Sequence, residues 1–287
     1  MSYRRRRSPL HAARAAAGLS YCLALGCAAL LLTAPVALGA VALSVWLAGA
    51  AAGVGRELRR AAVFALPLGL FVAVINALVT RDGVTVIWRL GDLPVLGHID
   101  ITLEATVYGA ILGLRAATLI LCAALYTAAV DPDEVLRLLR RVSFRSALTA
   151  TVATRMVPIL ARDSRRLADA QRCRSGPPAT RVQLLRASTA GILDRALDVA
   201  AALEVRGYGG ARRPPPHRRP FSRHDLGFLA AASALLGAAV GGRLAGLEPF
   251  AAYPALHAPL PAGELGLAAA LLVAALAPFA ERRGIEP

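Results

Sequence analysis

The sequence predicts an all-α integral membrane protein with about six transmembrane helices and a set of amphipathic cytoplasmic helices inserted between spans four and five. Three observations lead to this class. Hydrophobic residues make up 56% of the 287 residues, more than a soluble domain usually contains. Six apolar stretches approach the roughly 20 residues that a spanning helix needs. Arginine is concentrated in alternate connecting segments, as membrane topology requires.

The six apolar stretches define three parts of the chain. They lie at about 17–34, 36–54, 61–79, 105–130, 226–244 and 263–280. The first is too long, and too closely followed by the second, to be a cleaved signal peptide. Pro35 marks the turn between them. We therefore expect four spans in residues 1–130, a cytoplasmic insert at 131–223, and two spans in residues 224–287.

The distribution of arginine predicts the orientation of these spans. All 33 basic residues are arginine, and the formal net charge is +15. The insert 131–223 holds 19 arginines against 8 acidic residues, whereas the loop 245–262 holds no arginine. Basic residues favour the cytoplasmic side. Six spans place every arginine-rich segment there, which predicts a multi-pass protein of the bacterial cell membrane with both termini in the cytoplasm.

The insert begins with a short helix that is expected to lie on the membrane surface. Asp131 can cap this helix, Pro132 suits its first position, and Glu134 stands where a capping-box acid belongs. Two longer amphipathic helices follow, at 146–174 and 187–206, and arginines interrupt both too often for membrane spanning. Pro158 is expected to kink the first of them.

The two longer helices end in a similar phrase, 32 residues apart. One reads Ala170-x-x-x-Arg174-Ser175 and the other Ala202-x-x-x-Arg206-Gly207. In one interpretation these are ordinary helix ends, with Gly207 left-handed and Arg206 complementing the helix dipole. In the other, small neighbours allow each arginine to enter an acidic groove of a partner. Two such ends suit a partner with two equivalent grooves, such as a pair of ATPase subunits.

Charged residues within the fourth span raise a separate question. Arg115 lies well inside this span and Glu104 lies at its outer end, eleven residues away and too far for a direct pair. A mid-membrane arginine is costly unless it is paired or faces water. A solute path remains open, but we favour a role in helix packing, as for Arg155 and Pro158. Arg243 is close enough to the end of its span to extend to the interface.

Several functional classes lack support in the sequence. The four cysteines form no Cys-x-x-Cys motif or Cys/His cluster, so neither a metal site nor a disulfide framework is indicated. Few aromatic residues accompany the arginines, which argues against nucleic-acid binding. The sequence contains no Gly-x-x-x-x-Gly-Lys phosphate-binding loop and no evident catalytic constellation.

Five segments resemble the transmembrane (T) component of energy-coupling factor (ECF) transporters, the importers of vitamins and metals. The resemblance covers nearly the whole chain. The two most specific segments are the helices that end at Arg174-Ser175 and Arg206-Gly207-Tyr208. The five segments are INALVTRDGVTVIW (75–88), ITLEATVYGAILGLR (101–115), TAAVDPDEVLRLLRR (127–141), TRMVPILARDSRRLADAQRCRS (154–175) and ALDVAAALEVRGYGG (196–210). Ala77 and Ser175 depart from the commoner proline and glycine of the family pattern.

The resemblance implies a chain with no chemistry of its own. Two ABC-type ATPases, identical or different, would bind ATP and Mg²⁺, so this chain would hold no cofactor. Its coupling helices would dock on these ATPases, with Arg174 and Arg206 in their grooves beside Ala170, Ser175, Ala202 and Gly207. A separate substrate-capture (S) subunit in the bilayer would bind the vitamin or metal, such as cobalt or nickel, and the sequence does not identify that cargo.

Two other functions remain as alternatives. A stand-alone secondary transporter would show inverted repeats and a polar site at the midplane, and an arrangement of four spans plus two shows no such symmetry. A structural membrane protein with a basic, lipid-binding insert would tolerate the loss of either Arg174 or Arg206, because general charge would suffice. An intramembrane enzyme would need reactive groups at one depth, and none converge.

Overall fold

The computed structural model describes residues 6–80, 85–93, 97–139, 144–173, 180–207, 221–247, 250 and 262–281. The chain forms two compact units. The first unit, which we call the membrane unit, comprises residues 1–135 and 221–287. The second, which we call the insert unit, comprises residues 136–220.

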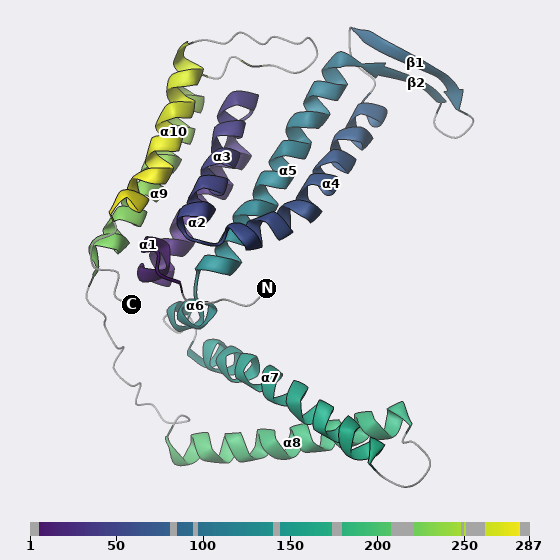
Figure 1. Ribbon diagram of the computed structural model, residues 1–287, viewed down its shortest axis with the longest axis vertical. Helices are drawn as coiled ribbons and strands as arrows, with labels where there is room; N and C mark the ends of the chain where they lie inside the picture. Colours follow the sequence, from purple (N-terminus) through teal and green to yellow (C-terminus); the bar gives the residue numbers. More distant parts are fainter. Residues whose placement is uncertain are drawn as a thin grey trace. The chain divides into compact units, whose positions relative to one another are not determined.

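The membrane unit is built from apolar helices (Figure 1). Each of the six expected apolar stretches forms a helix. Four are long and apolar enough to cross a membrane, and α2 and α3, with 17 residues each, are shorter. At 1.5 Å per residue α2 and α3 span about 25 Å. The helices are α1 (Pro9–Ala12), α2 (Ala15–Leu31), α3 (Pro35–Ala51), α4 (Gly55–Val79), α5 (Leu103–Ala129), α9 (Arg223–Leu244) and α10 (Ala262–Ala280).

A two-stranded hairpin is a departure from the predicted all-α class. Strands β1 (Val86–Leu93) and β2 (Gly97–Thr102) are antiparallel, with Val86 opposite Thr102. They lie in the segment that the sequence analysis treated as a loop between the third and fourth spans. β-Branched and aromatic residues, which favour strands, alternate with charged ones there. The charge count used to orient the spans does not detect this pattern.

An aromatic cluster lies in the core of the membrane unit. Tyr21 of α2 is fully buried, with its ring centroid 5.2 Å from that of Phe228 in α9 and 6.2 Å from that of Phe279 in α10. All three pairs are edge-to-face, a favourable geometry for aromatic rings. The Tyr21 hydroxyl donates to the carbonyl of Ala275 at 2.9 Å. One side chain thus joins three helices by packing and by a hydrogen bond.

Helices α4 and α5 lie side by side through a stripe of small residues (Figure 1). A Cβ atom added to Gly113 would lie 2.3 Å from the carbonyl oxygen of Gly69, and one on Gly109 would lie 2.5 Å from that of Ala73. Both distances are below van der Waals contact, so the two backbones touch. These glycines are required for close approach, because the described part of α4 and α5 contains no positive φ.

The start of the chain is fastened to the turn between α3 and α4. The Arg6 guanidinium donates to the carbonyl oxygen of Gly53 and to the carboxylate of Glu57. Gly53 ends α3 with a φ of +74°, a conformation that glycine adopts without strain. The interaction holds the segment before α1 against this turn.

Candidate functional site

The insert unit carries the two helix ends that the sequence marks as docking sites. Its helices are α7 (Phe144–Arg172) and α8 (Arg181–Val205), and α6 (Pro132–Leu139) leads into it. Ala170 is exposed in the last turn of α7. Arg174 and Ser175 lie outside the described residues, so the first phrase stays a prediction. The geometry of the second phrase can be described in full.

Helix α8 has well-formed ends. At its start the Thr180 side chain accepts from the Gln183 N–H while the Gln183 side chain accepts from the Thr180 N–H, which is a capping box. At its end the Arg206 N–H donates to the Ala202 carbonyl at 3.2 Å and the Gly207 N–H to the Glu204 carbonyl at 2.8 Å. Gly207 has a φ of +73°. Arg206 therefore occupies the last position before a left-handed glycine that stops the helix.

The end of α8 is open. Ala202, Arg206 and Gly207 are all exposed, and a Cβ atom on Gly207 would meet nothing within 4 Å. The two interpretations of this phrase are thus compatible. Gly207 acts as an ordinary C-terminal cap, and the same cap leaves the Arg206 guanidinium on a helix end that a partner can approach.

An ion pair joins the two helices of the insert unit. The Arg195 guanidinium of α8 donates to the carboxylate of Asp163 in α7. None of the side chains described in this unit is fully buried. Large apolar side chains are exposed on α8, including Leu193 at 63% and Val205 at 90%. A helical pair with so little core of its own is typical of a surface that a partner or a bilayer covers.

Two further candidates from the sequence lie on α7. Arg155 and Pro158 are both exposed there, and the helix continues through Pro158. The Pro158 carbonyl accepts from the Arg162 Nε at 3.3 Å. No contact described for Arg155 or Pro158 packs them against another helix, so their assigned role in packing stays a prediction.

Glu104 and Arg115 each bind a different partner. Glu104 is 2% exposed and accepts from the Thr85 hydroxyl at 2.8 Å and from the Thr85 N–H at 3.2 Å. It thereby fastens the hairpin to the start of α5. The Arg115 Nη2 donates to the Leu32 carbonyl at the end of α2, at 2.9 Å. Arg115 thus links two helices, and the expectation that it does not pair with Glu104 agrees with this geometry.

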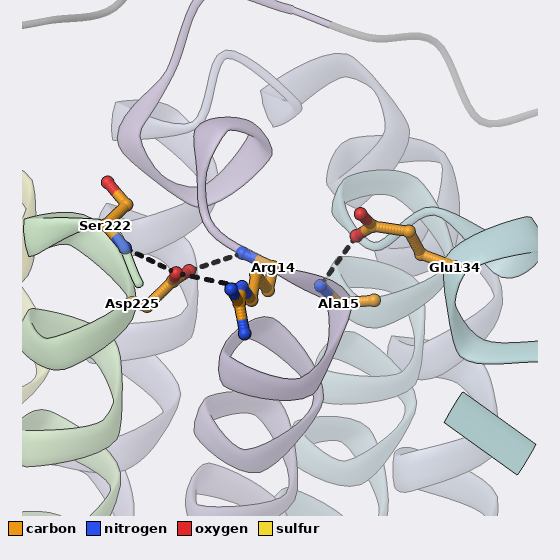
Figure 2. A network of polar contacts seen from close by, with 5 residues as sticks. All are labelled: Arg14, Ala15, Glu134, Ser222 and Asp225. Carbon is orange, nitrogen blue, oxygen red and sulfur yellow. Dashed lines mark hydrogen bonds and ion pairs between the residues drawn. The ribbon is translucent and has the colours of Figure 1, made fainter. Parts of the chain in front are cut away.

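A polar network that sequence reasoning missed lies where the chain leaves and re-enters the membrane unit (Figure 2). The Asp225 carboxylate accepts from the Arg14 N–H at 2.6 Å and from the Ser222 N–H at 2.9 Å. The Glu134 carboxylate accepts from the Ala15 N–H at 2.9 Å. The capping box Ser222-x-x-Asp225 could have been read from the sequence. Its contact with Arg14, 211 positions away, could not.

These features define a class and then a family. Apolar spanning helices with a separate, open helical unit are those of a multi-pass membrane protein that presents an accessible pair of helices. A family model described as CbiQ, cobalt transport protein, matches residues 6–217. The chain therefore belongs to the CbiQ family, the T component of ECF transporters. Members of this family are typically non-catalytic membrane components of a transporter. No curated protein matched the sequence.

Proposed function

We propose that this chain is the T component of an ATP-driven importer and that α7 and α8 dock on two ABC-type ATPases. The observation that carries the proposal is the end of α8, where a left-handed Gly207 leaves Arg206 exposed and without a neighbouring Cβ. An arginine presented in this way can make charge-assisted, bidentate hydrogen bonds to a carboxylate in a groove. The resemblance of Arg174-Ser175 to this end supports a second, equivalent dock.

The S subunit would bind the outward face of α4. Of the four long apolar helices, α4 buries the smallest share of its span. Phe64 and Phe71 are 76% and 60% exposed on it, in a run with Leu66 and Leu70. Lipid alone would satisfy this surface, since neither lipid nor a partner helix demands polar groups there. An S subunit that must bind and release needs such a face, free of interhelical polar bonds.

The remaining parts of the proposal follow from the same division of labour. ATP and Mg²⁺ would be bound by the partner ATPases, and the insert would face the cytoplasm together with both termini. The cargo would be a vitamin or a metal ion, with cobalt the first to test because of the family's description. Specificity for the cargo would belong to the S subunit.

The proposal is tested by the composition of the complex. The tagged chain, co-expressed with the ABC ATPases and candidate S subunits of its own genome, is expected to co-purify with two ATPase copies. Cells carrying all subunits should take up radioactive cobalt or the S subunit's vitamin, and an ATPase whose phosphate-binding lysine is replaced should abolish that uptake. Uptake by this chain without ATPases would instead indicate a stand-alone secondary transporter.

A further inference from the structure

The N-terminus of α2 binds two carboxylates, which come from two distant segments of the chain. The Arg14 N–H donates to Asp225 Oδ1 at 2.6 Å, and the next N–H, that of Ala15, donates to Glu134 Oε2 at 2.9 Å (Figure 2). The first N–H groups of a helix have no acceptor within the helix, and Arg14 provides no side-chain cap. Negative charge is also favoured at this end of the helix dipole. The two carboxylates thus satisfy what α2 itself lacks.

Asp225 is held from several directions. Its carboxylate is 1% exposed, and its Oδ2 accepts from the Ser222 N–H at 2.9 Å and faces the Arg14 Nε at 3.4 Å. The Arg14 guanidinium lies 4.3 Å from the centroid of the Phe221 ring. Arg14 therefore contacts the start of α9 through its backbone, its charge and its stacking on an aromatic ring. A shift of either segment would break several interactions together.

The two carboxylates flank the insert unit in the sequence. Glu134 lies two positions before that unit begins at Leu136, and Phe221 directly follows its last residue, Pro220. Both segments by which the chain crosses between the units are therefore bound to consecutive residues of α2. A displacement of either crossing is applied to the same helix end.

The other end of α2 is also bound. The Arg243 Nη1 of α9 donates to the Leu31 carbonyl at 2.6 Å, and Arg115 donates to the Leu32 carbonyl. Helix α9 thus contacts α2 at both ends, through Asp225 and Arg243, and through the ring pair of Tyr21 and Phe228 between them. Cations at the C-terminus complement the carboxylates at the N-terminus. Helices α2 and α9 are joined along their length and are expected to move as one body.

We propose that Arg14, Ala15, Glu134, Ser222 and Asp225 form a junction through which motion of the insert unit reaches α2 and α9. We call these five residues the α2 junction. Glu134 and Asp225 are its positioning residues. They contact neither cargo nor nucleotide, and they act by keeping both crossings on the start of α2. The inference rests on the proposed function, because ATPases must move the insert unit for the junction to transmit anything.

The test is hydrogen–deuterium exchange of the assembled complex, with ATP and vanadate or without nucleotide. In the natural chain, nucleotide is expected to change exchange both in α8 and in the first turn of α2. In the double variant Glu134→Gln/Asp225→Asn, which conserves shape and removes one acceptor at each site, the change in α8 should persist. The change in α2 should fall at least about fivefold, because a net hydrogen bond is worth roughly that factor.

A purely structural role predicts a different outcome. It would lower the melting temperature of the double variant and leave the nucleotide-dependent change in α2 intact, and that result would overturn the inference. Glu57→Gln is the matched control, because Glu57 is a carboxylate paired with Arg6 outside the junction. The control should retain the response of α2 in full.

Two further outcomes separate the inference from the function on which it rests. If α8 of the natural chain does not respond to nucleotide, the proposed function fails, and the inference fails with it. If the double variant does not assemble, the single variant Glu134→Gln gives the same comparison, since Glu134 is only partly buried. A full α2 response in that single variant, with α8 responding, would overturn the inference alone.

Discussion

Replacing Gly113 with leucine is expected to separate α4 from α5 and to destabilise the membrane unit by about 3 kcal/mol or more, at the upper end of overpacking costs. A Cβ atom at this position would lie 2.3 Å from the Gly69 carbonyl oxygen and 3.0 Å from its carbonyl carbon. The obstacle is backbone, which cannot turn aside as a side chain can. The measurement is the unfolding free energy in mixed detergent and SDS micelles, followed by circular dichroism.

Gly237→Leu is the matched control for this change. Gly237 lies in α9, and a Cβ atom there would meet nothing within 4 Å. Leucine also has the better helix propensity, by about 1 kcal/mol. The control is expected to unfold at an equal or higher SDS fraction than the natural chain. Equal stability of Gly113→Leu and Gly237→Leu would show that the α4–α5 contact is not as close as described.

Replacing Tyr21 with alanine is expected to cost about 3–4 kcal/mol, near the range for truncating a buried aromatic residue. The transfer of an apolar side chain into lipid offers little driving force, so most of this cost comes from the cavity left beside Phe228 and Phe279. The same SDS titration measures it. Loss of the contacts among α2, α9 and α10 should also broaden the transition.

Tyr21→Phe separates packing from hydrogen bonding at the same site. The ring remains, and only the donor to the Ala275 carbonyl is lost. Hydrogen bonds between membrane helices are worth about 1 kcal/mol or less, so this variant should be only slightly destabilised. If phenylalanine costs as much as alanine, the hydroxyl rather than the ring cluster joins these helices.

The apolar helices could be predicted from the sequence because a lipid environment requires long apolar segments. Their ends could not be predicted as well. The third stretch was expected at 61–79, yet α4 begins at Gly55, because the solvated arginines 56, 59 and 60 continue the same helix. Hydropathy detects the apolar part of a helix, and the backbone extends beyond it. The hairpin was missed because its strands were judged by charge rather than by alternation.

The candidate site was predictable to the extent that local chemistry decides it. Arg206 and Gly207 follow from a helix that needs a left-handed cap, and the structure has that cap. The contact between Arg14 and Asp225 depends on which helices are neighbours. Each residue is locally plausible alone, as a flanking cation and a capping acid, so one sequence contains no sign of their pairing. Likewise Arg115 stood out as a costly cation, but its acceptor, the Leu32 carbonyl, could not be read.

The central claim is that two arginine-bearing helix ends dock this chain on ATPases. The most direct measurement is co-purification of those ATPases with the double variant Arg174→Ala/Arg206→Ala, against Arg165→Ala/Arg186→Ala. The control removes the same charge from exposed sites on the same two helices. We predict that the first variant inserts normally and loses the ATPases, while the control retains them. Equal retention by both variants would contradict the claim and leave these arginines as helix caps.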